Sequence, residues 1–383
     1  MKRNSLFAKL VLLPISKIYG LVIAIRNRMF DMGLLKQTSF DIPVVVVGNL
    51  TMGGSGKTPH VEYIIEALRD KYKIGVLSRG YKRRTKGFVL ATHRSRPEDI
   101  GDEPYQIFQK YGDSVTVAVC EKRVVGIREM RAINPNINMI LLDDAFQHRY
   151  VNPSVSIVLS ECSRPPYYDK LLPYGRLREP MSALNRASMV VITKCPEDIK
   201  PLDYRVFTEN LNLFPYQKLF FSTYTYGHLV SVFPEHVTSI PYLDWLTPDD
   251  SILILTGVGN PRPFVLHIRK FKTRVKVKRY NDHHNYTPSD MEDIVKKFND
   301  MKGNRKFIVT TEKDAVRLSN NPYFPHSLKP FIFYIPISVE FIDPTGNTRG
   351  SAETANDVFD SELQKMIVKN SKTIGNPAAS QNS

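Results

Sequence analysis

Cysteine and tryptophan are scarce in this 383-residue sequence, which contains three cysteines and one tryptophan. Cys120, Cys162 and Cys195 are too widely spaced for a Cys-x-x-Cys motif or a zinc site. We therefore expect free thiols in a reducing compartment rather than a disulfide framework. The sequence also shows no internal repeats.

Acidic residues are comparatively few as well: the sequence has 38 aspartates and glutamates but 53 lysines and arginines. The formal net charge of +15 fits an anionic partner such as nucleic acid, an acidic membrane surface or a phosphorylated substrate. Diffuse solvated charge is the alternative. No nucleic-acid-binding signature is present, so we expect no nucleic-acid partner.

A long uninterrupted apolar run is absent, although residues 6–25 are mostly apolar. Lys9 and Lys17 lie within this stretch and disfavour a membrane-spanning helix. No cleavage site of small residues follows, which disfavours a signal peptide. At helical spacing one apolar stripe appears: Phe7, Val11, Ile15, Ile18, Val22 and Ile25.

We therefore expect residues 1–30 to form an amphipathic helix that lies in a membrane interface. Arg26 and Arg28 would add attraction to anionic headgroups. A spanning anchor and an ordinary helix packed on its own domain are the two alternatives.

A glycine-rich segment at residues 48–59 follows four valines at 44–47 and precedes a helical pattern. Strand, glycine-rich turn and helix form the context of a phosphate-binding loop. Lys57 would reach the β and γ phosphates of a nucleotide, and Thr58 would bind Mg²⁺. The expected nucleotide-binding residues are Thr51, Met52, Gly53, Gly54, Ser55, Gly56, Lys57 and Thr58. Thr51 replaces a glycine of the general motif, so a simple glycine-rich turn is the alternative.

An apolar strand expected at 137–142 ends in Asp143 and Asp144. Acidic residues at the end of a buried strand near a phosphate loop hold Mg²⁺, directly or through water. Paired carboxylates also form turns, but the phosphate loop upstream favours the metal-binding interpretation.

Other segments contain polar groups whose role the pattern leaves open. Asp102 opens a helix in the sequence Gly-Asp-Glu-Pro and could simply cap it. His283 and its neighbours could bind a metal, act in catalysis or form a polar loop. The segment 311–314, Thr-Glu-Lys-Asp, faintly resembles the guanine-reading motif of GTPases with the wrong spacing.

Alternating strands and helices over residues 40–210 predict an α/β fold with a doubly wound, mostly parallel sheet. A second, smaller α/β domain is expected beyond a linker, with a final strand at 331–339. The expected division is a membrane-interface helix (1–30), a P-loop nucleotide-binding domain (40–215), a linker or small sheet (216–245), a second α/β domain (246–370) and a disordered tail (371–383).

Taken together, several motifs resemble the tetraacyldisaccharide 4'-kinases of lipid A synthesis. They occur in the family's order and span most of the chain: GNLTMGGSGKTP (48–59), SRGY (78–81), GDEP (101–104), LLDDAFQHR (141–149), LREP (177–180), GVGNPRPF (257–264), DHHNYT (282–287) and TEKDAV (311–316). Thr51 agrees with the family pattern. Ala145 and Asn281 depart from it, but neither change removes a chemical group.

The resemblance implies transfer of the ATP γ-phosphoryl group to the 4'-hydroxyl of an acylated glucosamine disaccharide 1-phosphate. It places the general base at Asp102 and an orienting or relaying role at His283, with Lys57 as the third catalytic residue. Mg²⁺ would be held by Thr58 with Asp143 or Asp144. Weaker candidates for substrate or nucleotide contacts are Arg79, Tyr81, Gln147, His148 and Arg178.

The same resemblance implies a monomer held peripherally on the cytoplasmic face of the bacterial inner membrane, with its site between two closing domains. A membrane-associated nucleotide switch is the main rival, and it predicts guanine preference and slow hydrolysis without an acceptor. ATP-dependent ligases of the same fold class are a further alternative.

Overall fold

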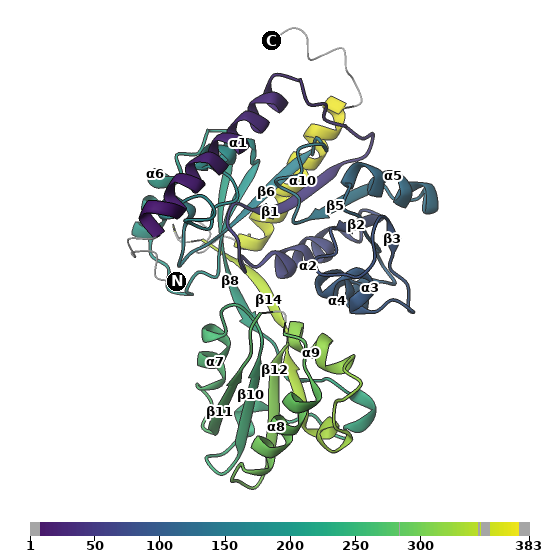
Figure 1. The fold of residues 1–383 in the computed structure, drawn as a ribbon, viewed down its shortest axis with the longest axis vertical. Coiled ribbons are helices and arrows are strands. Elements are labelled where there is room, and N and C mark those ends of the chain that lie inside the picture. The colour runs from purple at the N-terminus through teal and green to yellow at the C-terminus, as the bar shows by residue number, and fades with distance from the viewer. Residues whose placement is uncertain (1–7, 283, 344, 346–352, 375–383) are drawn as a thin grey trace.

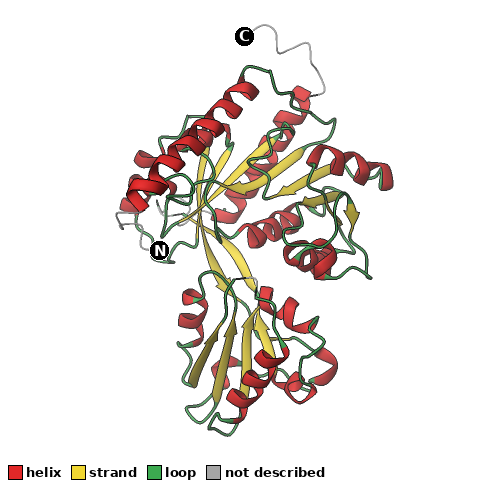
Figure 2. Cartoon of the chain, viewed as in Figure 1, coloured by secondary structure: helices red, strands yellow, loops and turns green. Residues whose placement is uncertain are grey.

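The computed structural model describes residues 8–282, 284–343, 345 and 353–374, which form two sheets covered by helices on both faces (Figures 1 and 2). The strand order is β14-β8-β7-β6-β1-β5-β2-β4-β3 in the first sheet and β11-β10-β12-β13-β9 in the second. Most neighbouring strands run parallel; the antiparallel pairs are β14–β8, β3–β4 and β13–β9. The expected α/β fold class is confirmed.

The nine-stranded sheet accounts for most of the first half of the chain. Its strands are β1 (Val44–Asn49), β2 (Ile74–Ser78), β3 (Val89–Leu90), β4 (Thr116–Val119), β5 (Met139–Asp143), β6 (Val155–Glu161), β7 (Met189–Thr193), β8 (Lys218–Tyr226) and β14 (Ile337–Ile342). Its helices are α2 (Lys57–Leu68), α3 (Pro97–Ile100), α4 (Asp102–Tyr111), α5 (Arg123–Ile133), α6 (Pro201–Leu211) and α10 (Ala355–Ile374).

β1 lies between β5 and β6 and is buried over its whole length. Val45 and Val47 pack in the cluster formed with α2, α4 and α10, whereas Val44 and Val46 pack in the cluster formed with α5 and α6. Successive side chains of a strand point to opposite faces, so a run of valines suits a strand covered on both sides. This burial holds the phosphate loop at the carboxyl end of β1.

The five-stranded sheet consists of β9 (Val230–Ser231), β10 (Ser251–Thr256), β11 (Arg274–Arg279), β12 (Lys306–Thr311) and β13 (Ile332–Ile335). Leu253 and Leu255 pack with α8 (Pro288–Asn299) and α9 (Glu312–Ser319). Ile252 and Ile254 pack on the other face with α7 (Arg262–Ile268). The two-sided apolar pattern that builds the first sheet therefore recurs here.

The end of the chain returns to the nine-stranded sheet, as Figure 1 shows for β14 and α10. Pro336 separates β13 from β14, and the two strands pair in different sheets. The prediction of a single strand at 331–339 is therefore wrong. Within the range 246–370, expected to form one domain, β13 belongs to the five-stranded sheet and β14 to the nine-stranded sheet. The division into domains itself stays a prediction. α10 runs to Ile374, and the remaining expected tail lies outside the described residues.

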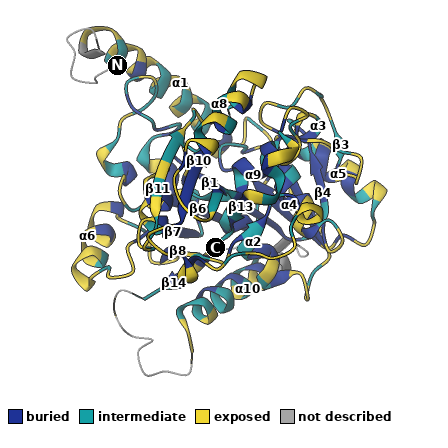
Figure 3. Cartoon of the chain, turned by 90° about the horizontal axis from the view of Figure 1, so that it is seen from below, coloured by how far each residue is buried: buried dark blue, intermediate teal, exposed yellow. Residues whose placement is uncertain are grey.

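A π-helical turn (Ala8–Leu12) and α1 (Leu13–Asp31) make up the described N-terminal helix. The expected apolar stripe faces outward: its members from Val11 to Ile25 are between 39% and 64% exposed (Figure 3). The opposite side is held by polar contacts, among them Ser16 Oγ to the Leu171 carbonyl at 2.7 Å. By length and composition, Leu10–Asp31 also qualifies as a membrane span, a test that signal sequences and core helices pass too.

Candidate active site

The loop between β1 and α2 has the backbone that a phosphate loop requires. Gly53 and Gly56 adopt φ values of +117° and +85°, a region that glycine enters without steric cost. A Cβ at Gly56 would also lie 1.9 Å from the Tyr224 hydroxyl oxygen. Glycine at this position is thus required by both conformation and space.

Distant segments hold the loop from outside. The Met52 amide donates to the Arg176 carbonyl at 2.7 Å, and Thr51 forms a bridge with Leu177. The Lys194 ammonium donates to the Gly54 carbonyl. Contacts with other segments therefore hold the loop, and the expected nucleotide-binding residues 51–58 form one continuous segment that leads into α2.

Lys57, the first residue of α2, lies close to the acidic end of β5. Its Nζ is 3.6 Å from Asp144 Oδ1, and Arg178 Nη1 donates to the same oxygen at 2.9 Å. Burial acts to raise the pKa of Asp144, but Lys57 and Arg178 outweigh it and the pKa is lowered. Gln147 also contacts Arg178, at 3.4 Å, so two of the weaker candidates join the site.

Asp143 is the buried member of the acidic pair, with 4% exposure. Its Oδ2 accepts a hydrogen bond from Ser78 Oγ at 3.3 Å, whereas its Oδ1 is buried without a partner among the described residues. Burial, and then the charge of Asp144, raise the pKa of Asp143 to about 6. An unpaired buried carboxylate oxygen of this kind suits a bound cation.

The donor set fits Mg²⁺, which prefers oxygen ligands and takes one or two carboxylates together with substrate phosphates. Asp143 and Asp144 supply the carboxylates, and Thr58, the second residue of α2, supplies a hydroxyl. Within the described ranges, no group of three or more histidines, cysteines or acidic residues is placed so that it could hold a metal ion. A site completed by nucleotide phosphates is the arrangement these residues allow.

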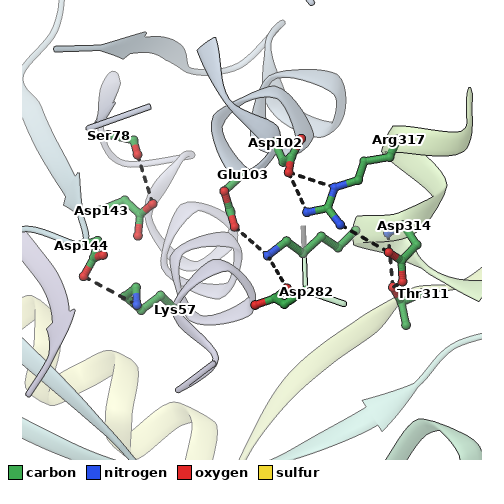
Figure 4. A network of polar contacts seen from close by, with 11 residues as sticks. Lys57, Ser78, Asp102, Glu103, Asp143, Asp144, Asp282, Thr311, Asp314 and Arg317 are labelled. Carbon is green, nitrogen blue, oxygen red and sulfur yellow. Dashed lines mark hydrogen bonds and ion pairs between the residues drawn. The ribbon is translucent and has the colours of Figure 1, made fainter. Parts of the chain in front are cut away.

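Asp102 begins α4 after Gly101, whose φ is +94°. Its Oδ2 accepts two hydrogen bonds from Arg317, from Nε at 2.9 Å and from Nη2 at 2.6 Å (Figure 4). Gly101 is the N-cap residue of this helix, and Asp102 and Glu103 place two acidic residues in its first turn. Figure 4 shows Glu103, the next residue of α4, on the side of Asp102 that faces Asp143 and Lys57. His283 lies outside the described residues.

The remaining weaker candidates, Arg79, Tyr81 and His148, lie in two different environments. Arg79 and Tyr81 follow β2 and are exposed, Tyr81 by 59%. His148 is anchored to the segment after β4, because its Nε2 lies 3.0 Å from the Glu121 carbonyl. Burial, and then Arg123, lower the pKa of His148. Its contact with substrate or nucleotide stays a prediction.

Sequence reasoning missed Lys194, His60 and Arg317. A lysine directly after an apolar strand was the available signal for Lys194. His60 bridges the Gly56 carbonyl at 2.8 Å and Ser222 Oγ at 2.9 Å, and burial lowers its pKa to about 4. Neither His60 nor Arg317 carries a local signal, because their partners lie far away in the chain.

A glycine-rich loop at the carboxyl end of a central parallel strand, a lysine that opens the next helix and an acidic pair on the adjacent strand define a P-loop nucleotide-binding protein. Asp102, held by Arg317, begins α4 beside this arrangement.

Comparison with known proteins specifies the class. The family model described as tetraacyldisaccharide-1-phosphate 4'-kinase matches residues 8–350, and the chain belongs to this family. The tetraacyldisaccharide 4'-kinase of Bacteroides thetaiotaomicron is 48% identical over 86% of this chain and 88% of its own length. That of Phocaeicola vulgatus is 42% identical over 94% of this chain and 96% of its own length.

A solved structure agrees with these relatives. The Aquifex aeolicus LpxK crystal structure in complex with ATP superposes with a TM-score of 0.69 at 25% identity. The match covers 96% of this chain and 100% of that chain. The similarity therefore extends across both sheets.

Proposed function

We propose that this chain transfers the γ-phosphoryl group of ATP to the 4'-hydroxyl of a tetraacyl glucosamine disaccharide 1-phosphate in lipid A biosynthesis. Family membership supports the reaction. The observation that carries the residue assignment is the meeting of the phosphate loop, the Asp143–Asp144 pair and the start of α4 at one edge of the nine-stranded sheet.

In this proposal residues 51–58 cradle the phosphates of ATP, and Lys57 places a positive charge beside the β and γ groups. Mg²⁺, when bound, neutralises charge that builds on the transferred group. Asp143 is the direct ligand, since it has the unpartnered oxygen, and Thr58 completes the protein's contribution. Asp144 is already engaged by Lys57 and Arg178 and orients both toward the phosphates.

Asp102 accepts the proton of the sugar hydroxyl as the new phosphate ester forms. Phosphoryl transfer has a loose transition state, so holding the acceptor in line matters more than strong basicity. His283 keeps its predicted role of orienting or relaying, as a proposal.

The decisive experiment measures transfer of labelled γ-phosphate from ATP to the lipid acceptor in detergent micelles. Lys57→Ala should lower turnover by about 10²–10³-fold and Asp102→Asn by about 10²–10⁴-fold. Lys365→Ala, an exposed lysine on α10, is the control and should leave turnover unchanged. Acceptor-independent hydrolysis with GTP preference would instead support the nucleotide switch.

The structure offers that switch no base-reading motif in segment 311–314. These residues follow β12 in the five-stranded sheet, and Asp314 is fully buried. Its carboxylate accepts hydrogen bonds from the Gly257 amide and from Thr311 Oγ1. Asp314 is therefore committed to contacts within its own sheet.

We also propose that the outer face of α1 lies in the cytoplasmic leaflet of the inner membrane and that the protein works there as a monomer. In a surface helix of a soluble protein the apolar face packs against the core, whereas the apolar face of α1 is turned away from the protein. Arg26, expected at headgroups, instead donates to the Gln147 carbonyl at 3.1 Å, which ties α1 to the site.

Liposome co-sedimentation tests the membrane proposal. The double variant Ile18→Glu/Val22→Glu should lose most binding to anionic liposomes and keep its ATP affinity, because both side chains point outward. Leu202→Glu, a change at a similarly exposed residue of α6, is the matched control. Equal binding by the double variant and the control would refute an interfacial role for α1.

A further inference from the structure

The TEKDAV motif begins with Thr311, the last residue of β12 and the N-cap of α9, and residues 312–317 lie in that helix. Nothing in the proposed reaction uses this segment. Three of its charged side chains contact α4, the helix that begins with Asp102. Figure 4 draws the contacts to Asp102 and Glu103. The contacts are Glu312 to Lys110 at 2.8 Å, Lys313 to Glu103 at 2.9 Å and Arg317 to Asp102 at 2.6 Å.

The contact between Arg317 and Asp102 differs from an ordinary surface ion pair. Two of the three guanidinium nitrogens, Nε and Nη2, donate to the single oxygen Oδ2 of Asp102. The side chains are only 8% and 20% exposed. Burial disfavours the charge of Arg317, but the Asp102 carboxylate offsets this and the pKa of Arg317 is raised. Two donors in a planar fork restrict the acceptor more than a single lysine contact does.

Arg317 is itself held by a buried support. Its Nη1 contacts Asp314 Oδ1 at 3.5 Å. Asp314 in turn accepts hydrogen bonds from the Gly257 amide at 2.9 Å and from Thr311 Oγ1 at 2.7 Å. The chain of contacts thus runs from the end of β10 through α9 to Asp102, and it links the motifs GVGNPRPF, TEKDAV and GDEP.

We infer that Arg317 is a positioning residue for phosphoryl transfer, which holds the Asp102 carboxylate in one orientation at the edge of the phosphate site. The inference rests on the proposed role of Asp102 as proton acceptor. It also makes turnover depend on the docking of α9 against α4, since the five-stranded sheet supplies the guanidinium and the nine-stranded sheet the carboxylate.

A nearby positive charge favours the ionised form of a carboxylate. The other charged groups around this pair are Glu103 on α4, Lys313 and Asp314 on α9, and Asp282, which lies 3.6 Å from Lys313. Lys313 is shared between Glu103 and Asp282, whereas Arg317 contacts Asp102 directly through two nitrogens. Loss of Arg317 should therefore disturb Asp102 more than loss of Lys313.

The test compares Arg317→Met and Arg317→Lys in the micellar transfer assay. We expect kcat to fall by about 10- to 100-fold in both, with an unchanged KM for ATP, because the described side-chain contacts of Arg317 are with Asp102 and Asp314. The acid limb of the pH–rate profile should move to higher pH in Arg317→Met only, because lysine retains the positive charge. Arg317→Lys should still lose kcat, because lysine cannot reproduce the two-donor geometry of the guanidinium. Arg305→Met removes a similar two-nitrogen contact to Asp250 and should change neither quantity.

A double-mutant cycle separates this inference from the proposed function. In an Asp102→Asn background, Arg317→Met should cause little further loss of kcat, because both changes act on one interaction. An equal loss in both backgrounds, or an unchanged kcat in Arg317→Lys, would overturn the positioning role. Full turnover in Asp102→Asn alone would instead remove Asp102 as the base. If Arg317→Met does not fold, Arg317→Lys still decides between these outcomes.

Discussion

A buried aspartate lies at the carboxyl end of each sheet, near the start of α4, but the two aspartates differ in how fully their oxygens are hydrogen-bonded. At the end of β5, Asp143 has a buried oxygen without a described partner, and Asp144 adopts a φ of +47°. At the start of α9, Asp314 is equally buried and its raised pKa also comes from burial, yet its oxygens accept several hydrogen bonds. Unsatisfied and strained groups are typical of a ligand site, whereas satisfied ones serve assembly.

The clearest satisfied cluster joins three helices. Lys110 of α4 lies 2.6 Å from Glu62 of α2 and 2.8 Å from Glu312 of α9. Gln106 adds a hydrogen bond to Glu62 at 2.8 Å. Burial, and then the charge of Glu312, raise the pKa of Glu62, and Lys110 opposes that shift. One lysine therefore holds two carboxylates together across the junction of the two sheets.

Lys110→Met should have the largest effect on stability. Two nearly buried carboxylates would lose their shared counter-charge, and we expect the free energy of unfolding to fall by about 3 kcal/mol at pH 7.5. The loss should shrink as the pH falls, because protonation of a carboxylate relieves the repulsion. Urea unfolding at several pH values measures both effects. An unchanged free energy would show that this cluster does not hold the sheets together.

Asp143→Asn should change stability in the opposite direction. The folded-state pKa of about 6 lies above the unfolded value of 3.8, so the folded protein binds this proton more tightly. The cost of the charged form is absent below about pH 4 and complete above about pH 6. Without divalent cations, the variant should gain about 1–2 kcal/mol at pH 7.5, and it should gain almost nothing near pH 4.

Asp250 in the five-stranded sheet provides the control for that measurement. Arg305 lowers the pKa of Asp250, so this carboxylate stabilises the fold above its unfolded pKa and the contribution is lost on acidification. Asp250→Asn should therefore lose stability at pH 7.5. Destabilisation of both variants to the same extent would remove the distinction between the two sheet ends.

Tyr105→Phe should have the smallest effect. The Tyr105 hydroxyl donates to Asn320 Oδ1 across the contact between α4 and α9, but at 3.4 Å and in an exposed position. A long hydrogen bond in water contributes little, so we expect a change below about 0.5 kcal/mol. A loss comparable with that of Lys110→Met would show that the junction depends on hydrogen bonding in general rather than on its buried charges.

Much of the fold was predictable because strands 44–47, 189–193 and 251–255 are short apolar runs with a local signal. The strand expected at 331–339 failed, because periodicity does not reveal that a chain leaves one sheet and enters another at Pro336. The apolar stripe of α1 was also found from spacing alone. Its outward direction was not determined by spacing, since an inward stripe has the same pattern.

The sequence by itself determined the phosphate loop, the acidic pair after β5 and the family, because each depends on residues that lie close together in the chain. Only the tertiary structure decided that Asp102 meets Arg317, 215 residues away, and that His60 supports Gly56. The tertiary structure alone also shows that Asp143 Oδ1 is buried without a partner in the described part of the chain. Burial and charge pairing are set by segments that pack together from distant positions, and no local pattern encodes them.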